Sequence, residues 1–179
     1  MKQTKPSILE LRSLSLVLDG QSRVHRMVRQ KTRRMPRQVA ERVALEFVAR
    51  INQGDADGLS ELMSVDHRLV DSLGSQVAGR SVVREAWIQY FKMVPGYRLA
   101  IQTTLTNGPT VVLLGTAGGG YIPSGRRVSV GRWRTPAAWR ALVRRGLVTE
   151  WQVFADNEPI RALARRGSRS PRWTPKTGH

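Results

Sequence analysis

The chain has 179 residues, a length that suits one domain with a sizeable hydrophobic core. It contains no cysteine, which excludes disulfides and thiolate metal ligands. The formal net charge is +17, but residues 1–38 carry +8 and residues 161–179 carry +6, whereas residues 39–160 carry only +3. The excess charge therefore belongs to the two ends, and the central part lacks the composition of a basic nucleic-acid-binding domain.

The two basic ends are predicted to be flexible, because they combine like charges with few apolar residues. This predicts a basic extension over residues 1–36, a folded domain over 37–166 and a basic tail over 167–179. Such ends bind phosphate backbones weakly and without sequence specificity, so nucleic-acid association through the termini is one alternative function. Met35 is an alternative start of the chain, which the sequence leaves open.

Membrane insertion is not expected. No apolar run approaches the ~20 residues that span a bilayer. The one stretch that resembles a signal peptide, residues 8–18, is interrupted by Glu10 and Arg12 and is not followed by a cleavage site. We therefore expect a cytoplasmic protein.

The central part predicts helices first and strands afterwards. Three segments carry apolar residues at the three- and four-residue spacing of amphipathic helices: 37–53, 55–63 and 79–93. Five segments alternate apolar and polar residues or are rich in β-formers, and are predicted strands: 66–72, 97–106, 109–121, 126–143 and 147–156. A short terminal helix is predicted over 156–165. This order predicts an α+β domain, with three N-terminal helices on one face of a mainly antiparallel sheet.

Two features interrupt the predicted strands. Gly118, Gly119 and Gly120 lack the strand–loop–helix order and the lysine of a phosphate-binding loop, so we interpret them as a bulged and curved strand. Pro136 removes a hydrogen-bond donor from the strand 126–143, which predicts a bulge or a sheet edge at that position.

A carboxylate at the end of the first predicted strand is the strongest candidate for chemistry. Asp71 lies two residues after Leu69, so both are predicted to point to the inward side of the strand. Buried carboxylates are rare unless they are paired or used. Asp71 is therefore predicted to act as a general acid/base, with His67, on the same side, as a second acid–base group. The alternatives are a cap of the following turn for Asp71 and a rim or interface position for His67.

Large aromatic residues fall on inward positions of the predicted helices and strands. Together they predict an apolar pocket for a small molecule beside Asp71, lined by six residues: Phe47, Leu69, Trp87, Tyr90, Trp139 and Trp151. For any single tryptophan, plain filling of the core is the alternative. The three histidines show no metal-ligand spacing, so neither a metal nor another cofactor is expected.

The order of elements, with N-x-G-D-x-D-G from Asn52 to Gly58 and D-S-L-G from Asp71 to Gly74, resembles the nuclear transport factor 2-like superfamily. Within it, the chain is similar to ketosteroid isomerases and SnoaL-like polyketide cyclases. The resemblance implies a cone with a pocket at its open end, and an aspartate at position 71 that serves as the base. It also implies a homodimer through the outer sheet face, on which Phe154 is an apolar residue.

The same resemblance excludes part of the isomerase machinery. The position of the isomerase tyrosine matches Phe47, and no acid lies near Ala138, where a second acidic residue is expected. Because both oxyanion donors are missing, steroid isomerisation is not expected. The leading hypothesis is a metal-free isomerase or cyclase-type enzyme, and the alternative is a non-catalytic ligand-binding or dimerisation module.

Overall fold

The computed structural model of the protein describes residues 37–123 and 128–167. The predictions for the basic extension, for the tail from residue 168 and for residues 124–127 lie outside this part. The helices are α2 (Arg37–Gln53), α3 (Ala56–Leu62), α4 (Arg80–Met93) and α5 (Glu158–Gly167). The strands are β1 (Met63–Val70), β2 (Gln76–Ala78), β3 (Arg98–Asn107), β4 (Thr110–Gly120), β5 (Arg132–Arg144) and β6 (Leu147–Ala155).

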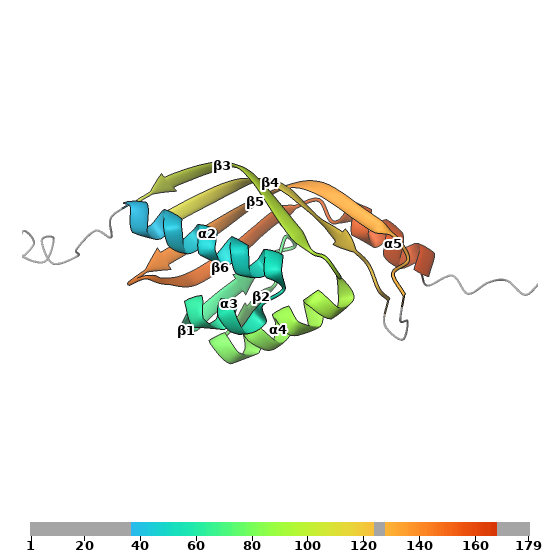
Figure 1. Ribbon diagram of the computed structural model, residues 1–179, viewed down its shortest axis with the longest axis horizontal. Coiled ribbons are helices and arrows are strands. Elements are labelled where there is room, and N and C mark those ends of the chain that lie inside the picture. The colour runs from blue at the N-terminus through green and yellow to red at the C-terminus, as the bar shows by residue number, and fades with distance from the viewer. Residues whose placement is uncertain (1–36, 124–127, 168–179) are drawn as a thin grey trace, which may run out of the picture. The chain divides into compact units, whose positions relative to one another are not determined.

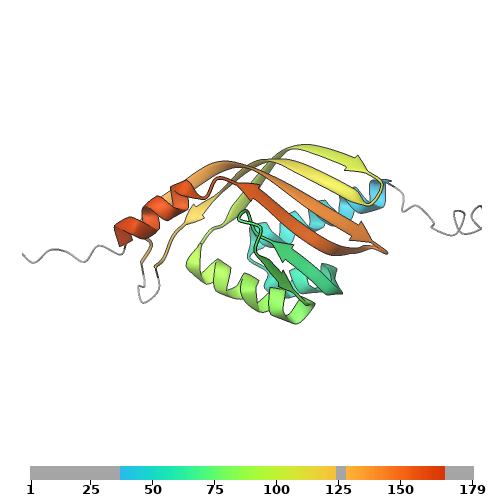
Figure 2. The same ribbon diagram turned by 180° about the vertical axis from the view of Figure 1, so that it is seen from behind.

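The six strands form one curved sheet in the order β2-β1-β6-β5-β4-β3 (Figure 1). Neighbouring strands are antiparallel except β1 and β6, which run parallel. Helix α2 packs across β3, β4, β5 and β6, while α4 packs against β1, β2 and α3. Figure 2 shows from behind that these helices lie on one side of the sheet. The predicted α+β architecture is confirmed, and so are the three N-terminal helices.

Helix α2 shows why the sequence folds in this way. Its apolar stripe, which includes Val43, Phe47 and Ile51, is buried against the sheet, while its other face stays accessible. Asp55 ends the connection to α3 as an N-cap, since its carboxylate accepts a 2.8 Å hydrogen bond from the Gly58 amide. Arg50 donates to the same carboxylate at 2.9 Å, so the cap also joins the two helices.

The first strand differs most from the prediction. β1 begins at Met63, three residues before the predicted start, and ends at Val70, two residues before the predicted end. A three-residue strand, β2, follows the turn and pairs with β1 so that Val77 lies opposite Leu69. The sequence did not predict β2, because three residues are too few to show alternation. Strand β5, which corresponds to the predicted strand 126–143, also begins later than predicted, at Arg132.

Of the two predicted strand interruptions, the one at the glycine run is wrong and the one at Pro136 is confirmed. The glycines continue the regular register of β4 against β5, so the predicted bulge there is wrong. Their small size is needed instead, because a Cβ at Gly119 would lie 2.8 Å from Val94 Cγ1. The predicted edge at Pro136 is confirmed, since the pairing of β5 with β6 ends at Ala137.

Candidate functional site

A cavity of about 450 Å³ lies between α4, the β1–β2 segment, the end of β6 and α5. This volume is within the usual range of small-molecule sites. Most of its walls are apolar or aromatic, and these residues come from five separate parts of the chain: Leu69, Val77, Ala86, Trp87, Tyr90, Met93, Tyr97, Val153 and Ile160. Its polar residues come from the β1–β2 turn and from α5. A mainly apolar cavity with polar groups from these two segments is suited to an amphipathic small molecule.

The aromatic wall comes from α4 and from the residue before β3. The Trp87 ring stacks on Phe91 at a centroid distance of 5.3 Å and meets the edge of Tyr90 at 5.8 Å. Tyr97 in turn meets the edge of Tyr90 at 4.9 Å. Such mutual contacts hold each ring in one orientation. The wall is therefore rigid, and it presents two phenols and one indole to the cavity.

The two phenols stay neutral at physiological pH. Burial raises the pKa of Tyr90 to about 12, although interaction with the Tyr97 hydroxyl acts in the opposite direction. Burial also raises the pKa of Tyr97 well above its ordinary value. A neutral phenol donates a hydrogen bond. The indole Nε1 of Trp87 is buried and has no hydrogen-bond partner among the described residues, so the wall contains a donor that is unused there.

Asp71 lies at the edge of this cavity, just beyond the end of β1. Its side chain is exposed, and Oδ1 accepts hydrogen bonds from the amides of Leu73 (2.8 Å) and Ser75 (2.9 Å). Gly74 completes the turn at a φ of +86°, which favours glycine. The expected burial of Asp71 is wrong, because β1 ends at Val70, one residue before Asp71, and the carboxylate is turned into the loop. The alternative, a cap of this turn, is confirmed, and the same residue still lines the cavity.

The start of helix α5 contributes polar residues to the cavity, on the side opposite the Asp71 turn. The Asn157 amide donates a 2.5 Å hydrogen bond to the Ser72 hydroxyl, which joins the start of α5 to the Asp71 turn. Arg161 lies one turn along the helix and also lines the cavity. An anionic and a cationic side chain, Asp71 and Arg161, thus belong to the same polar region. Asn157 and Arg161 were not predicted to belong to the site, because the sequence of a terminal helix does not indicate which part of the sheet the helix will cover.

His67 lies apart from this cavity. It is fully buried, its Nδ1 is 2.8 Å from the Val148 carbonyl oxygen, and its ring packs 5.9 Å from Phe47. A carbonyl only accepts, so Nδ1 carries the proton, and Nε2 has no partner among the described residues. Desolvation lowers the pKa of His67, more than the Val148 contact raises it. His67 is a neutral core residue and does not lie beside Asp71 at the cavity.

Three of the six predicted lining residues occupy the core instead. Phe47, Trp139 and Trp151 are fully buried, and the rings of Phe47 and Trp151 pack at 4.9 Å. They belong to the hydrophobic core between α2 and the sheet. Leu69, Trp87 and Tyr90 line the cavity as expected. Tyr97 was missed, although its place directly after Pro95-Gly96 marked the start of a strand.

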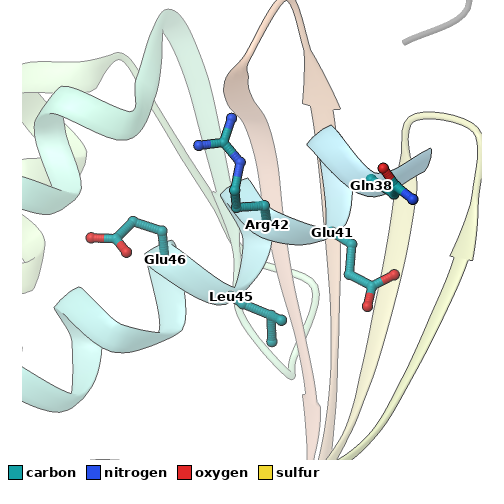
Figure 3. A pocket seen from close by; sticks show the side chains of 5 residues that line it. All are labelled: Gln38, Glu41, Arg42, Leu45 and Glu46. Atoms are coloured by element: carbon teal, nitrogen blue, oxygen red, sulfur yellow. The ribbon is translucent and has the colours of Figure 1, made fainter. Parts of the chain in front are cut away.

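A second depression, of about 440 Å³, lies on the accessible face of α2. It is lined by Gln38, Glu41, Arg42, Leu45 and Glu46, all from one helix, and their side chains point in different directions in Figure 3. Glu41 and Glu46 already accept hydrogen bonds from Thr106 and Arg50. With no opposing wall, this surface lacks the enclosure of a small-molecule site.

Comparison with known families agrees with this architecture. The family described as "SnoaL-like domain" matches residues 44–151, which run from α2 through Trp151 on β6. The chain belongs to the SnoaL-like domain family. A comparison with curated proteins finds no match. In the described part of this SnoaL-like protein, no helix is long and apolar enough to cross a membrane.

Solved structures show the same fold at low sequence identity. A candidate polyketide cyclase from Xanthomonas campestris pv. campestris is 20% identical, with 72% of this chain and 98% of that chain covered and a TM-score of 0.63. A candidate hydroxylase from Streptomyces galilaeus is 17% identical, with coverages of 76% and 87% and a TM-score of 0.62. A hypothetical protein with a ketosteroid isomerase-like fold from Catenulispora acidiphila, solved in complex with trimethylamine, is 19% identical, with coverages of 74% and 97% and a TM-score of 0.59.

Proposed function

We propose that this SnoaL-like protein binds an apolar small molecule in the cavity between α4, the β1–β2 turn and α5. The observation that carries the proposal is the aromatic wall of Trp87, Tyr90 and Tyr97, which faces a space of about 450 Å³. Aromatic walls supply large apolar contact, and their N–H and O–H groups orient the ligand. A ligand with a fused-ring body and one polar end matches a cavity with apolar walls and the Asp71–Arg161 region.

Filling the cavity tests this proposal. Ala86 lines the cavity on α4, whereas Val82, one turn earlier, is exposed and does not line it. We expect a tricyclic aromatic ketone such as anthrone to quench tryptophan fluorescence, and Ala86→Phe to weaken its binding at least tenfold by occupying the space. The matched control, Val82→Phe, leaves binding unchanged. Equal binding to both variants would place the ligand elsewhere.

A second candidate function is acid–base catalysis on the bound ligand, with Asp71 as the proton carrier. It is favoured by the position of Asp71 on the cavity and by its Oδ2, which accepts no hydrogen bond from the described residues, whereas Oδ1 is engaged in the turn. An isomerase or cyclase needs a base that reaches a proton next to a carbonyl. The similarity in fold to candidate polyketide cyclases is consistent with this chemistry. This proposal gives no catalytic role to His67, which is buried in the core away from the cavity.

Substitution of Asp71 by Asn separates binding from catalysis. Asn keeps an oxygen for the amides of Leu73 and Ser75 but cannot accept a proton. We expect Asp71→Asn to bind anthrone as before and to lose at least 100-fold in the protein-catalysed exchange of the acidic C10 methylene hydrogens of anthrone for deuterium, followed by NMR. Asp66→Asn, on an exposed residue outside the cavity, is the control. Exchange that survives in Asp71→Asn would leave a binding module.

The predicted homodimer is part of the same proposal. On the outer sheet face, Leu114, Ala138 and Phe154 lie opposite one another on three neighbouring strands, and Leu114 and Phe154 are 39% and 50% exposed. An apolar row of this kind favours burial against a second copy of the chain. The cytoplasmic location also stays a prediction.

A further inference from the structure

A groove of about 470 Å³ crosses β3, β4 and β5 on the sheet face opposite the helices. Its floor contains Gly118, and three arginine side chains stand around it: Arg98, Arg132 and Arg134. All three arginines are exposed, and they come from two strands that do not neighbour each other. The groove is separate from the cavity, which lies on the helix side.

The strand register brings the arginines together. Arg98 on β3 and Arg134 on β5 both lie opposite Gly118 on the strand between them. Two strand spacings separate the backbones of these arginines by about 10 Å, and Arg132 is roughly 7 Å from Arg134 along β5. Gly118 contributes no side chain to the space between Arg98 and Arg134. Arg134 is also held in place, because its Nη2 donates to the Thr116 hydroxyl at 3.1 Å.

The groove contains no counter-charge. The sequence has no Asp or Glu between Glu85 and Glu150, so β3, β4 and β5 are free of acidic residues. None of the ion pairs among the described residues involves Arg98, Arg132 or Arg134. By contrast, Arg140, farther along β5, pairs with Glu150. Three cations gathered without an anion repel one another, and a bound anion would relieve that repulsion.

We propose that this groove is a binding site for a small phosphate-bearing anion. Guanidinium groups form bidentate, charge-assisted hydrogen bonds with phosphate oxygens. Three of them around a floor of small residues match a di- or triphosphate group, which carries several negative charges in a compact volume. The recognition comes from arginine side chains, and the groove differs from a phosphate-binding loop because its glycines lie within a paired strand.

The test is a calorimetric titration of the full-length protein with inorganic pyrophosphate in ~0.1 M NaCl, where attraction to distant charges is screened. We expect one saturable site, and at least tenfold weaker binding by the variant Arg98→Gln/Arg134→Gln. Arg144→Gln is the matched control, because Arg144 is exposed on the same strand as Arg134 but roughly 33 Å away along it. It should bind pyrophosphate within twofold of the parent protein.

Two results would overturn the proposal. One is an equal change of affinity in the double variant and in Arg144→Gln, which would show that net charge alone attracts the anion. The other is the absence of saturable pyrophosphate binding while a single-stranded oligonucleotide binds, which would assign the basic surface to nucleic acid. Unchanged circular dichroism of the double variant excludes unfolding as the cause of a loss, since both arginines are exposed.

Discussion

The two faces of the sheet differ in almost every chemical respect, although the same strands build both. On β6, Trp151 is fully buried against the helices, while Phe154, on the other face, is half exposed. On β5, Trp139 is fully buried, whereas Arg134 and Arg140 point outward. The helix side thus holds the core and an aromatic cavity, and the outer side holds an arginine groove and an apolar row.

This contrast teaches that alternation along a strand assigns each residue to a face but does not say what that face does. The helix side is divided in two: α2 fills one part with Phe47, and the part beside α4 stays open as the cavity. The outer side is divided by charge. Near Glu150 the arginines are paired, and near Gly118 they are not. The proposed binding sites are the open cavity on the helix side and the unpaired arginines on the outer side.

The largest expected effect compares the two faces on one strand. Trp151→Ala should lower the free energy of unfolding by about 3–5 kcal/mol, because it leaves a large cavity beside Phe47. Phe154→Ala should lower it by less than about 1 kcal/mol, since that side chain is already half exposed. Urea denaturation measures both. Similar losses would mean that the outer face is as buried in solution as the core.

A smaller effect is expected at the ion triad of the outer face. The Glu150 side chain is only 7% exposed, and it accepts from Arg68 at 2.6 Å and also from Arg140. Glu150→Gln should cost about 1–2 kcal/mol, below the usual cost of breaking a fully buried pair, because both arginines are about half exposed and stay solvated. The same variant should leave pyrophosphate binding within twofold, because Glu150 lies opposite Leu142, eight residues or roughly 26 Å along β5 from Arg134, and charges at that distance are screened in ~0.1 M NaCl. A larger change in affinity would contradict this electrostatic account.

The core histidine predicts a modest dependence of stability on pH. Because burial lowers the pKa of His67 below 6.5, the unfolded chain binds the proton more readily than the folded one. Stability should therefore fall as the pH drops below about 6.5, by at most about 1.4 kcal/mol per pH unit from this residue. Urea titrations at several pH values measure it. His67→Gln should remove this part of the slope, and an unchanged slope would assign it to other groups.

The smallest effect on stability, and the sharpest on assembly, is expected at the apolar row. Phe154→Arg should convert a dimer to a monomer in sedimentation at micromolar concentration, because it replaces the most exposed apolar side chain of the row with a charge. Val65→Arg, at an exposed position on β1, is the control and should leave the assembly unchanged. A parent protein that sediments only as a monomer would refute the predicted dimer.

The sequence by itself determined most of the helices and strands and the buried side of the strand tryptophans Trp139 and Trp151. The helical spacing in α2 and the alternation around Trp139 and Trp151 are local patterns, and local patterns report backbone geometry and burial. They were sufficient for the α+β architecture and for the resemblance to the family, whose model matches residues 44–151. They were also sufficient to place Leu69, Trp87 and Tyr90 where the cavity lies.

Only the tertiary structure decided which buried positions enclose a space. Phe47 and Trp151 meet each other across the core, so their bulk fills the cone instead of lining a pocket. Asp71 falls one residue beyond β1, where loop amides engage its carboxylate. Arg98 and Arg134 are far apart in the sequence and become neighbours only through their common pairing with Gly118. These outcomes depend on long-range pairing and on the volumes of side chains from distant segments, and neither is encoded in the pattern of any one segment.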